Sequence, residues 1–330
     1  MSKILVAVLR GGPSAEHEVS LNTGAAVLRA FEGTEFSPVD VIISRKGEWL
    51  RNGKVWDPLQ ILQAVDVVFN ALHGTYGEDG TLQRYLDAHG IPYTGSSAYA
   101  SSLAMNKALT KDHVKELPLK LAPHVYASAE SIDDTSLFAE AVTDLFNGPY
   151  VIKPVSSGSS VGTRIVNSTD ELAAALAELL PVHDKLMVEK RVFGKEATVG
   201  IIDEFREQRR YVLPPIEIVP KREFFDFETK YGNDTHETEI CPGRFTYDEK
   251  KRLGEAAAAV HDTLGLRHYS RSDFIVANDG VYFLEVNTLP GLTEASLLPK
   301  ALDSVGISYK AFIRHLVMQS LNHAPTHYGR

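Results

Sequence analysis

The sequence predicts an α/β protein with more than one domain, and three observations support this prediction. Apolar, β-branched segments alternate with helical segments through residues 3–93, which is typical of a parallel sheet with helical crossovers. The chain has 330 residues, more than a single compact core usually contains. Hydrophobic residues make up 44% of the chain and charged residues 23%, so there is enough apolar material for sizeable cores.

The N-terminal segment contains the strands of the first expected sheet. Three apolar runs have the composition of buried strands and lie at residues 3–9, 39–43 and 65–72. Residues 19–31, between the first two, carry apolar side chains at helical spacing. Ligands bind beyond the carboxyl ends of parallel strands, so we expect the loops at 11–20 and 73–80 to be binding loops.

A second α/β region follows a stretch of small residues at 93–97. Its expected elements are a helical stretch, a strand, a Gly/Ser loop and a closing strand, at residues 98–114, 149–154, 155–162 and 185–192. A helix is also expected at 169–180, because Ser168 and Glu171 have the spacing of a capping box.

A third region occupies the rest of the chain. It begins with a polar stretch at 224–239, and a helix at 246–264 is indicated by the capping-box pair Thr246 and Glu249. Two strands and a final amphipathic helix are expected at 269–276, 281–287 and 308–318. Residues 323–330 have no pattern and are expected to form a loose tail.

The two strands of the third region are expected to form an acidic hairpin. Residues 278–280, Asn-Asp-Gly, suit a three-residue turn with glycine in the left-handed position. This turn pairs Ala277 with Val281 and, counting outward, Asp273 with Glu285. Because side chains alternate across a strand, one face is polar and holds Arg271, Asp273, Glu285 and Asn287. The other face would be core and holds Phe274, Val276, Tyr282, Leu284 and Val286.

Two opposed carboxylates in an apolar sheet repel each other and are costly to bury. A divalent cation removes this cost, and carboxylate and amide oxygens are ligands that magnesium takes together with phosphate oxygens. The hairpin therefore predicts a metal site. The alternative is a solvated hairpin whose acids only keep the protein soluble, but the flanking residues are too apolar for an exposed ribbon.

The Gly/Ser loop at 155–162 has the composition of a phosphate-binding loop. Its backbone N–H groups and hydroxyls can surround phosphate oxygens, although it is not a Walker A loop. Such a loop is most often only a connection. The preceding strand carries Lys153 among apolar neighbours, and a lysine there requires an anion. Lys107 is weaker evidence, because a lysine on a helix is usually solvated.

Charge and cysteine content exclude several classes of protein. The formal net charge is −9, which argues against a nucleic-acid partner but not against a local basic pocket. The single cysteine, Cys241, excludes a disulfide framework and favours the cytoplasm. The apolar run at the N-terminus ends at Arg10, too early for a signal peptide, and no apolar run is long enough to span a membrane.

Several short segments stand in order along the chain: Gly-Gly-Pro-Ser-Ala-Glu-His-Glu-Val-Ser at 11–20, His-Gly-Thr-Tyr-Gly-Glu-Asp-Gly at 73–80, Tyr-Thr-Gly-Ser at 93–96, the lysine strand with Gly-Ser-Ser at 158–160, Lys-Tyr at 230–231 and Glu-Val-Asn-x-x-Pro-Gly-x-Thr at 285–293. Together they resemble the D-alanine–D-alanine ligases of the ATP-grasp superfamily, from about residue 3 to residue 318. The resemblance implies three α/β domains: an N-terminal parallel-sheet (pre-ATP-grasp) domain at 1–96, followed by a two-domain ATP-grasp fold at 97–189 and 190–322.

The resemblance also implies roles in nucleotide and metal binding. Lys107, Lys153 and Ser160 would hold the ATP phosphates, Glu189 the adenine edge and Glu196 the ribose hydroxyls. The magnesium (or manganese) ions, two in number in such enzymes, would be bound by Asp273, Glu285 and Asn287, which are the residues that the hairpin argument reached independently.

For the amino-acid substrates, the resemblance implies a second set of residues. Glu16 would bind the ammonium of the first D-alanine, with Ser159 and Tyr231 hydrogen-bonded near it and residues 224–239 acting as a lid. Arg271 and the N–H of Gly291 would stabilise the oxyanion. The remaining substrate-binding residues would be His73, Lys230 and Ser296. Taken singly, Glu16 and His73 would be ordinary surface residues and Ser296 a helix cap.

The implied activity is ATP-dependent formation of D-alanyl-D-alanine through a D-alanyl phosphate, for peptidoglycan precursor synthesis, by a homodimer. One alternative is a related ATP-grasp ligase that takes D-lactate or D-serine as second substrate. Lys230 and Tyr231 favour the amide product, whereas His236 would favour an ester. Another alternative is a nucleotide-binding module without chemistry. The chain departs from the family pattern at Ser270, where glycine is usual, and we expect the serine to be tolerated with a tighter fit around Arg271.

Overall fold

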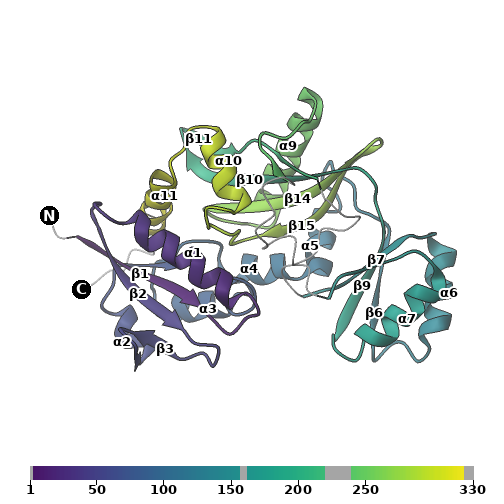
Figure 1. The fold of residues 1–330 in the computed structure, drawn as a ribbon, viewed down its shortest axis with the longest axis horizontal. Coiled ribbons are helices and arrows are strands. Elements are labelled where there is room, and N and C mark those ends of the chain that lie inside the picture. The colour runs from purple at the N-terminus through teal and green to yellow at the C-terminus, as the bar shows by residue number, and fades with distance from the viewer. Residues whose placement is uncertain (1–2, 157–161, 220–238, 323–330) are drawn as a thin grey trace.

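Three β-sheets follow one another along the molecule, each with helices packed against it (Figure 1). The structure, a computed structural model, describes residues 3–156, 162–219 and 239–322.

The first sheet is built around three parallel strands, as the alternation of strands and helices predicts. Its order is β4-β3-β2-β1-β5, and β1 pairs in parallel with both β2 and β5. The strands are β1 (Ile4–Gly11), β2 (Phe36–Ile43), β3 (Trp49–Arg51), β4 (Lys54–Trp56) and β5 (Val67–Asn70). The short strands β3 and β4 add an antiparallel edge that we did not expect. The helices of this region are α1 (His17–Ala30), α2 (Pro58–Leu62) and α3 (Thr81–Ala88).

The helical stretch expected at 98–114 is two helices. They are α4 (Ala98–Met105) and α5 (Lys107–Val114). The break lies at Asn106, whose backbone is extended and whose side chain accepts hydrogen bonds from the N–H groups of Ala108 and Leu109. Asparagine competes well for such caps, so the chain starts a new helix here. As a result, Lys107 stands in the first turn of α5.

The second sheet is antiparallel and has the order β6-β9-β7-β8. Its strands are β6 (His124–Ser128), β7 (Tyr150–Pro154), β8 (Arg164–Val166) and β9 (Lys185–Lys190), and its helices are α6 (Thr135–Leu145) and α7 (Thr169–Leu179). Only half of the capping box expected on α7 forms. Ser168 accepts from the Glu171 N–H, but the Glu171 carboxylate accepts from Asn167 instead of from Ser168.

The third sheet has the order β13-β12-β10-β14-β15, with β11 paired to β10. Its strands are β10 (Lys195–Phe205), β11 (Gln208–Val212), β12 (Ile216–Ile218), β13 (Glu239–Ile240), β14 (Tyr269–Ala277) and β15 (Gly280–Asn287). Helix α9 (Tyr247–Thr263) covers one face of it (Figure 1). The capping box of α9 is complete, because Thr246 and Glu249 exchange both hydrogen bonds.

The hairpin of β14 and β15 has the predicted pairing at its polar end and a different turn. Ala277 pairs with Gly280, so the loop has two residues and the three-residue turn is wrong. A bulge between Asp273 and Phe274 shifts the register by one residue, which restores the pairing of Asp273 with Glu285. The bulge also changes the apolar face of β15.

On β15 the predicted core residues Tyr282 and Leu284 are only half-buried. Their neighbours Val281 and Phe283 fill the core instead. The physical reason is the turn, which is one residue shorter than predicted and therefore adds one residue to the start of β15. A shift of one residue exchanges the two faces of a strand, so the buried and exposed positions of β15 are exchanged between the turn and the bulge.

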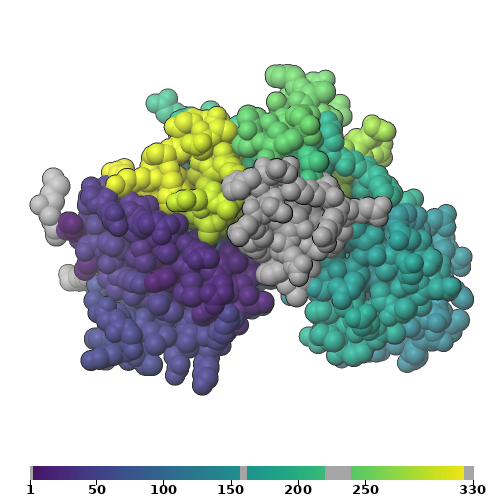
Figure 2. Space-filling view, in the orientation of Figure 1, coloured from purple at the N-terminus to yellow at the C-terminus, as the bar shows by residue number. Residues whose placement is uncertain are grey.

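The C-terminal helices return to the N-terminal sheet. They are α10 (Leu297–Ser304) and α11 (Tyr309–Asn322). Val8 and Phe69 of the first sheet belong to the same apolar core as Leu298 and Phe312 of these helices. Figure 2 shows the yellow C-terminal atoms directly against the purple N-terminal ones. Within the described residues, no helix is both long and apolar enough to cross a membrane.

Candidate active site

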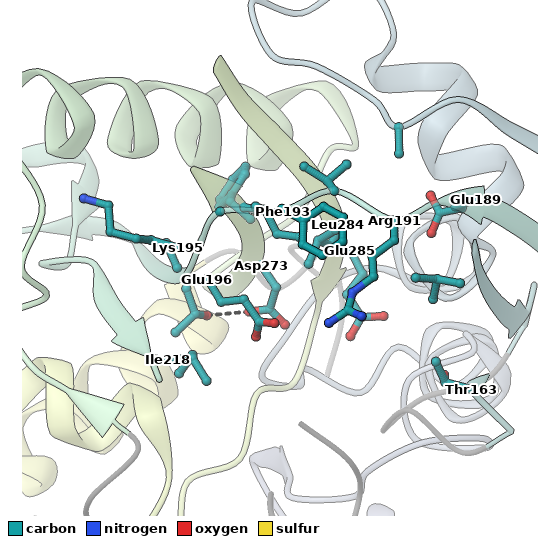
Figure 3. Close-up of a pocket in the computed structure, with 18 of the residues that line it drawn as sticks. Thr163, Glu189, Arg191, Phe193, Lys195, Glu196, Ile218, Asp273, Leu284 and Glu285 are labelled. Carbon is teal, nitrogen blue, oxygen red and sulfur yellow. Dashed lines mark hydrogen bonds between the residues drawn. The ribbon is translucent and has the colours of Figure 1, made fainter. Parts of the chain in front are cut away.

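A cavity of about 430 Å³ lies where the second and third sheets approach each other. The strands β7, β9, β10, β14 and β15 each contribute to its wall. The predicted site residues that line it are Lys107, Lys153, Glu189, Glu196, Arg271, Asp273 and Glu285. In Figure 3, Glu196, Asp273 and Glu285 extend from the third sheet, and Glu189 projects from β9 on the other side.

The carboxylate of Asp273 is held at both oxygens. Arg271 donates from Nε and an Nη at 3.0 and 2.9 Å, and the Thr198 hydroxyl donates at 2.5 Å. The Nδ2 group of Asn287 donates to the same carboxylate at 3.3 Å, so the amide oxygen of Asn287 stays available. The hairpin thus brings its expected polar residues together.

Lysines neutralise two other carboxylates of the cavity, those of Glu285 and Glu189. Lys107 Nζ lies 3.2 Å from Glu285. Glu189 lies between two lysines, with Lys153 Nζ 2.5 Å from one oxygen and Lys111 Nζ 2.6 Å from the other. The two ammonium groups hold the pKa of the Glu189 carboxyl at about 2, although its burial acts in the opposite direction.

Glu196 has the opposite electrostatic environment. Burial raises the pKa of its carboxyl, the charge of Asp273 raises it further, and Arg191 partly offsets the two effects. Glu196 and Asp273 lie close together in Figure 3.

The residues present fit a divalent cation that also binds phosphate. The described part of the chain contains no group of three or more His, Cys, Asp or Glu side chains arranged around a metal. Magnesium is usually held by one or two carboxylates, with phosphate oxygens and water completing its shell. Asp273, Glu285 and the oxygen of Asn287 form such a donor set. A small cavity of about 30 Å³ adjoins it, lined by Lys107, Glu285 and Asn287 together with Glu78.

The loops that follow β1 and β5 form a second part of the site. The Ser14 hydroxyl donates to the His73 carbonyl at 2.6 Å, and a Glu16 carboxylate oxygen would lie 2.7 Å from a Cβ placed on Gly74. Glu16 and His73 are both buried, so neither is an ordinary surface residue. The two loops thus lie together where β1 and β5 end, and that they bind a ligand stays a prediction.

His73 connects these loops to the loop after β15. Its Nδ1 lies 3.0 Å from the Leu289 carbonyl and its Nε2 lies 2.8 Å from the Thr23 hydroxyl. Burial lowers the pKa of the imidazole, and the carboxylate of Glu16 partly offsets this. The charge of Arg271 lowers the same pKa, which places Arg271 within electrostatic reach of His73.

Gly291 and Ser296 lie together in the loop between β15 and α10. A Cβ on Gly291 would lie 2.8 Å from the Ser296 hydroxyl, so a larger residue there would displace Ser296. Ser296 occupies the N-cap position of α10, but its hydroxyl does not cap that helix. It contacts Thr293 instead, at 3.1 Å from the N–H and 2.8 Å from the hydroxyl.

Some predicted site residues lie outside the described part of the chain, and some residues that contact the site were not predicted. Ser159, Ser160, Lys230 and Tyr231 lie outside the described residues, as does His236. The sequence reading gave no role to three residues that contact the site, namely Glu78, Lys111 and Thr198. Lys111 follows Lys107 by one helical turn, and this spacing of two lysines was a signal that could have been used.

Two antiparallel sheets that enclose a cavity lined by lysines and carboxylates, next to a parallel-sheet domain, form the ATP-grasp fold of nucleotide-dependent ligases. Comparison with known families identifies the particular family. A family model described as D-ala D-ala ligase N-terminus matches residues 5–96, and one described as D-ala D-ala ligase C-terminus matches residues 114–318. The chain belongs to the D-alanine–D-alanine ligase family.

Individual relatives agree with this assignment over nearly their whole length. A D-alanine–D-alanine ligase of Geobacter sulfurreducens is 41% identical over 322 residues, which cover 96% of this chain and 93% of that protein. The solved D-alanine–D-alanine ligase of Bacillus anthracis complexed with ATP is 29% identical with a TM-score of 0.80, over 97% of this chain and 98% of that one. The solved VanG D-Ala:D-Ser ligase of Enterococcus faecalis is 27% identical with a TM-score of 0.81, and the match covers 96% of this chain and 99% of that one.

Proposed function

We propose that this chain joins two molecules of D-alanine into D-alanyl-D-alanine, with conversion of ATP to ADP and phosphate, and so supplies a precursor of peptidoglycan. The observation that carries the proposal is the position of Arg271. It lines the cavity of about 430 Å³ between the two antiparallel sheets, and its charge also acts on His73 in the buried loops of the N-terminal sheet. In this proposal, one guanidinium lies between the region that would bind phosphate and the region that would bind the amino acid.

The reaction requires activation of a carboxylate. A carboxylate does not react with an amine in water, because it is resonance-stabilised and its leaving group would be hydroxide. Transfer of the γ-phosphoryl group of ATP to the first D-alanine gives a D-alanyl phosphate, whose leaving group is phosphate. The amine of the second D-alanine, after loss of a proton, attacks the acyl carbon. The bond from that carbon to the phosphate oxygen then breaks.

The residues of the cavity are suited to binding the nucleotide. Lys107 and Lys153 would hold phosphate oxygens, Glu189 would accept from the adenine amino group and Glu196 would bind the ribose. Asp273, Glu285 and Asn287 would hold magnesium, which when bound neutralises charge on the phosphate oxygens. The loop residue Ser160 adds a hydroxyl to this phosphate site in the proposal.

The residues around Arg271 are suited to the second step. Glu16 would bind the ammonium of the first D-alanine, and Arg271 with the N–H of Gly291 would stabilise the tetrahedral oxyanion. Loss of one such donor typically raises the barrier by about 3–4 kcal/mol. Arg271 shares its guanidinium with Asp273 in this structure, so its position is set before the substrate arrives. Ser159, Lys230, Tyr231, His73 and Ser296 complete the proposed amino-acid site.

The test is a product assay with the purified full chain, magnesium and ATP. D-alanine should cause release of ADP and phosphate together with an equal amount of D-alanyl-D-alanine, measured by chromatography. L-alanine is the matched control, since it differs only in the configuration of one carbon. Equal ADP release with both isomers, or none with either, would exclude the proposal.

The second substrate is tested separately, because the Enterococcus faecalis relative is a D-Ala:D-Ser ligase. Each reaction contains D-alanine together with an equal concentration of D-serine or D-lactate. We expect D-alanyl-D-alanine as the main product at both mildly acidic and mildly alkaline pH. A predominant D-serine peptide or D-lactate ester would assign the chain to the alternative branch of the family.

The proposal includes a setting for the enzyme. Because ATP is consumed and the only cysteine is unpaired, we place the reaction in the cytoplasm. A homodimer is proposed from the resemblance, and light scattering of the purified chain measures it.

A further inference from the structure

Helix α5 carries a lysine that faces the site without lining the cavity. Lys107 and Lys111 lie one turn apart, and both are on the buried side of the helix. Lys111 is 1% exposed. Two like charges at this spacing destabilise a helix unless anions compensate them. The compensation comes from two other elements, because Glu285 of β15 contacts Lys107 and Glu189 of β9 contacts Lys111.

Glu189 is paired with two lysines that differ in their position relative to the cavity. Lys153 lies on the cavity wall and can exchange its partner for a bound anion, whereas Lys111 lies behind the carboxylate. Burial lowers the pKa of Lys111 and the charge of Glu189 counteracts this effect. Lys111 and Glu189 therefore stabilise each other's charged form at a place that water does not reach.

Three ammonium groups, of Lys107, Lys111 and Lys153, face the two carboxylates of Glu189 and Glu285. Each of these lysines has a carboxylate within ion-pair distance, and Glu189 is the carboxylate that has two. Lys153 can bind a phosphate only if it turns away from Glu189. If Lys111 were absent, that movement would leave the Glu189 carboxylate buried without a cation.

We propose that Lys111 is a positioning residue that keeps Glu189 paired, so that Lys153 is free to bind the phosphate groups of the nucleotide. The proposal rests on the proposed function, since Lys153 is taken as a phosphate ligand and Glu189 as the contact to the base. It assigns a role to Lys111 without any contact between Lys111 and substrate. In a variant without Lys111, Lys153 stays on Glu189, and recognition of phosphate suffers more than recognition of the base.

The experiment compares binding of ADP and adenosine by calorimetry at one magnesium concentration. For Lys111→Met we expect the Kd of ADP to rise by about tenfold or more, and that of adenosine by less than about threefold. Lys111→Arg should preserve most of the ADP affinity, because it keeps a cation next to Glu189. The matched control is Lys115→Met at the C-cap of α5, where the lysine is exposed and bound to Asp112. It should change neither Kd.

A double-mutant cycle distinguishes positioning from a general loss of structure. Once Glu189→Gln removes the carboxylate that Lys153 contacts directly, Lys153 has no direct ion pair to leave and only the charge of Glu285 still acts on it. Lys111→Met in that background should therefore leave the ratio of ADP to adenosine affinity unchanged. The double variant removes both charges of the buried pair. It can therefore be compared with Glu189→Gln even if Lys111→Met alone does not fold. A change of ratio in both backgrounds would overturn the proposal, as would equal weakening of ADP and adenosine. Failure of the wild-type chain to bind ADP would instead exclude the proposed function.

Discussion

Glu78 lies between two loops that come from opposite ends of the chain. One carboxylate oxygen accepts from the Gly74 N–H at 2.7 Å, and the other accepts from the Leu289 N–H at 3.0 Å. Removal from solvent, and then the nearby charge of Glu16, raise the pKa of Glu78 to about 8. A single side chain thus joins the two halves of the proposed amino-acid site, and its charge depends on pH.

This raised pKa makes the stability of the chain depend on pH. An acid with a raised pKa binds more protons in the folded state than in the unfolded state. The stability that protonated Glu78 contributes to the folded chain is fully present below its ordinary pKa of 4.5 and is lost as the pH rises through about 8. Thermal melting between pH 5 and pH 9 should therefore show a decrease in the wild-type chain that is smaller in Glu78→Gln. Parallel curves for the two proteins, whatever their absolute stability, would contradict this account.

At the scale of secondary-structure elements, the interface between α9 and the third sheet contains buried polar contacts. His261 of α9 places Nδ1 2.7 Å from the Ser270 hydroxyl and Nε2 3.0 Å from Asp203. Both His261 and Ser270 are fully buried. Side chains alternate along β14, so Ser270 faces α9 while Arg271 faces the cavity. Ser270, which we expected to tighten the fit around Arg271, therefore contacts a helix on the other side of the sheet.

Ser270 and Ser272 of the same strand make a matched pair for testing this interface. Both are 0% exposed, but among the described residues the Ser272 hydroxyl has no hydrogen-bond partner. Ser270→Ala should lower the free energy of unfolding by about 1–3 kcal/mol, because it leaves a buried imidazole nitrogen without its partner. Ser272→Ala should be neutral or stabilising, because it removes an unpaired buried hydroxyl. Urea unfolding measures both, and equal effects of the two substitutions would show that the Ser270 hydrogen bond contributes nothing.

The hairpin at the centre of the site owes its geometry to a bulge. The two-residue turn alone would place Asp273 and Glu285 out of register, and the extra residue at the bulge brings them opposite each other. Bulges are frequent next to active sites, where they redirect side chains. Here Leu284 and Glu285 are consecutive and both line the cavity.

At the scale of the whole molecule, the last helix belongs to the same core as the first sheet. Phe312 of α11 is fully buried and packs edge-to-face on Tyr269, with ring centroids 5.7 Å apart. The same core includes Val6 and Phe69. The domain boundaries at 96, 189 and 322 remain a proposal, and the described members of this core come from the first and third of the proposed domains.

Truncation of Phe312 should therefore destabilise a sheet that lies far from it in sequence. Phe312→Ala should cost about 3–5 kcal/mol, because it leaves a cavity among buried core residues. Amide hydrogen exchange should accelerate in β1 and β5 as well as in α11. Arg314→Ala is the control on the same helix, since its exposed pair with Glu35 contributes about 0–1 kcal/mol. Exchange that accelerates in α11 alone would mean that the N-terminal sheet is stable without this helix.

The sequence by itself determined the local structure and much of the chemistry. The alternation of strands and helices predicted the parallel sheet, and the capping box at Thr246 predicted the start of α9, because these patterns depend on neighbours in the chain. The polar face of the acidic hairpin was also predictable, since Asp273 and Glu285 are separated by a single turn. The break at Asn106 could have been predicted from its capping propensity.

Only the tertiary structure decided which charges meet across elements. Lys111 contacts Glu189 across 78 positions of sequence, and His73 contacts the Leu289 carbonyl across 216. No periodicity encodes such pairs, because they depend on how separate sheets and helices pack. The bulge and the exchanged faces of β15 could not be predicted from the sequence for a similar reason. A one-residue shift leaves the composition unchanged, and it is selected by the burial that the assembled core provides.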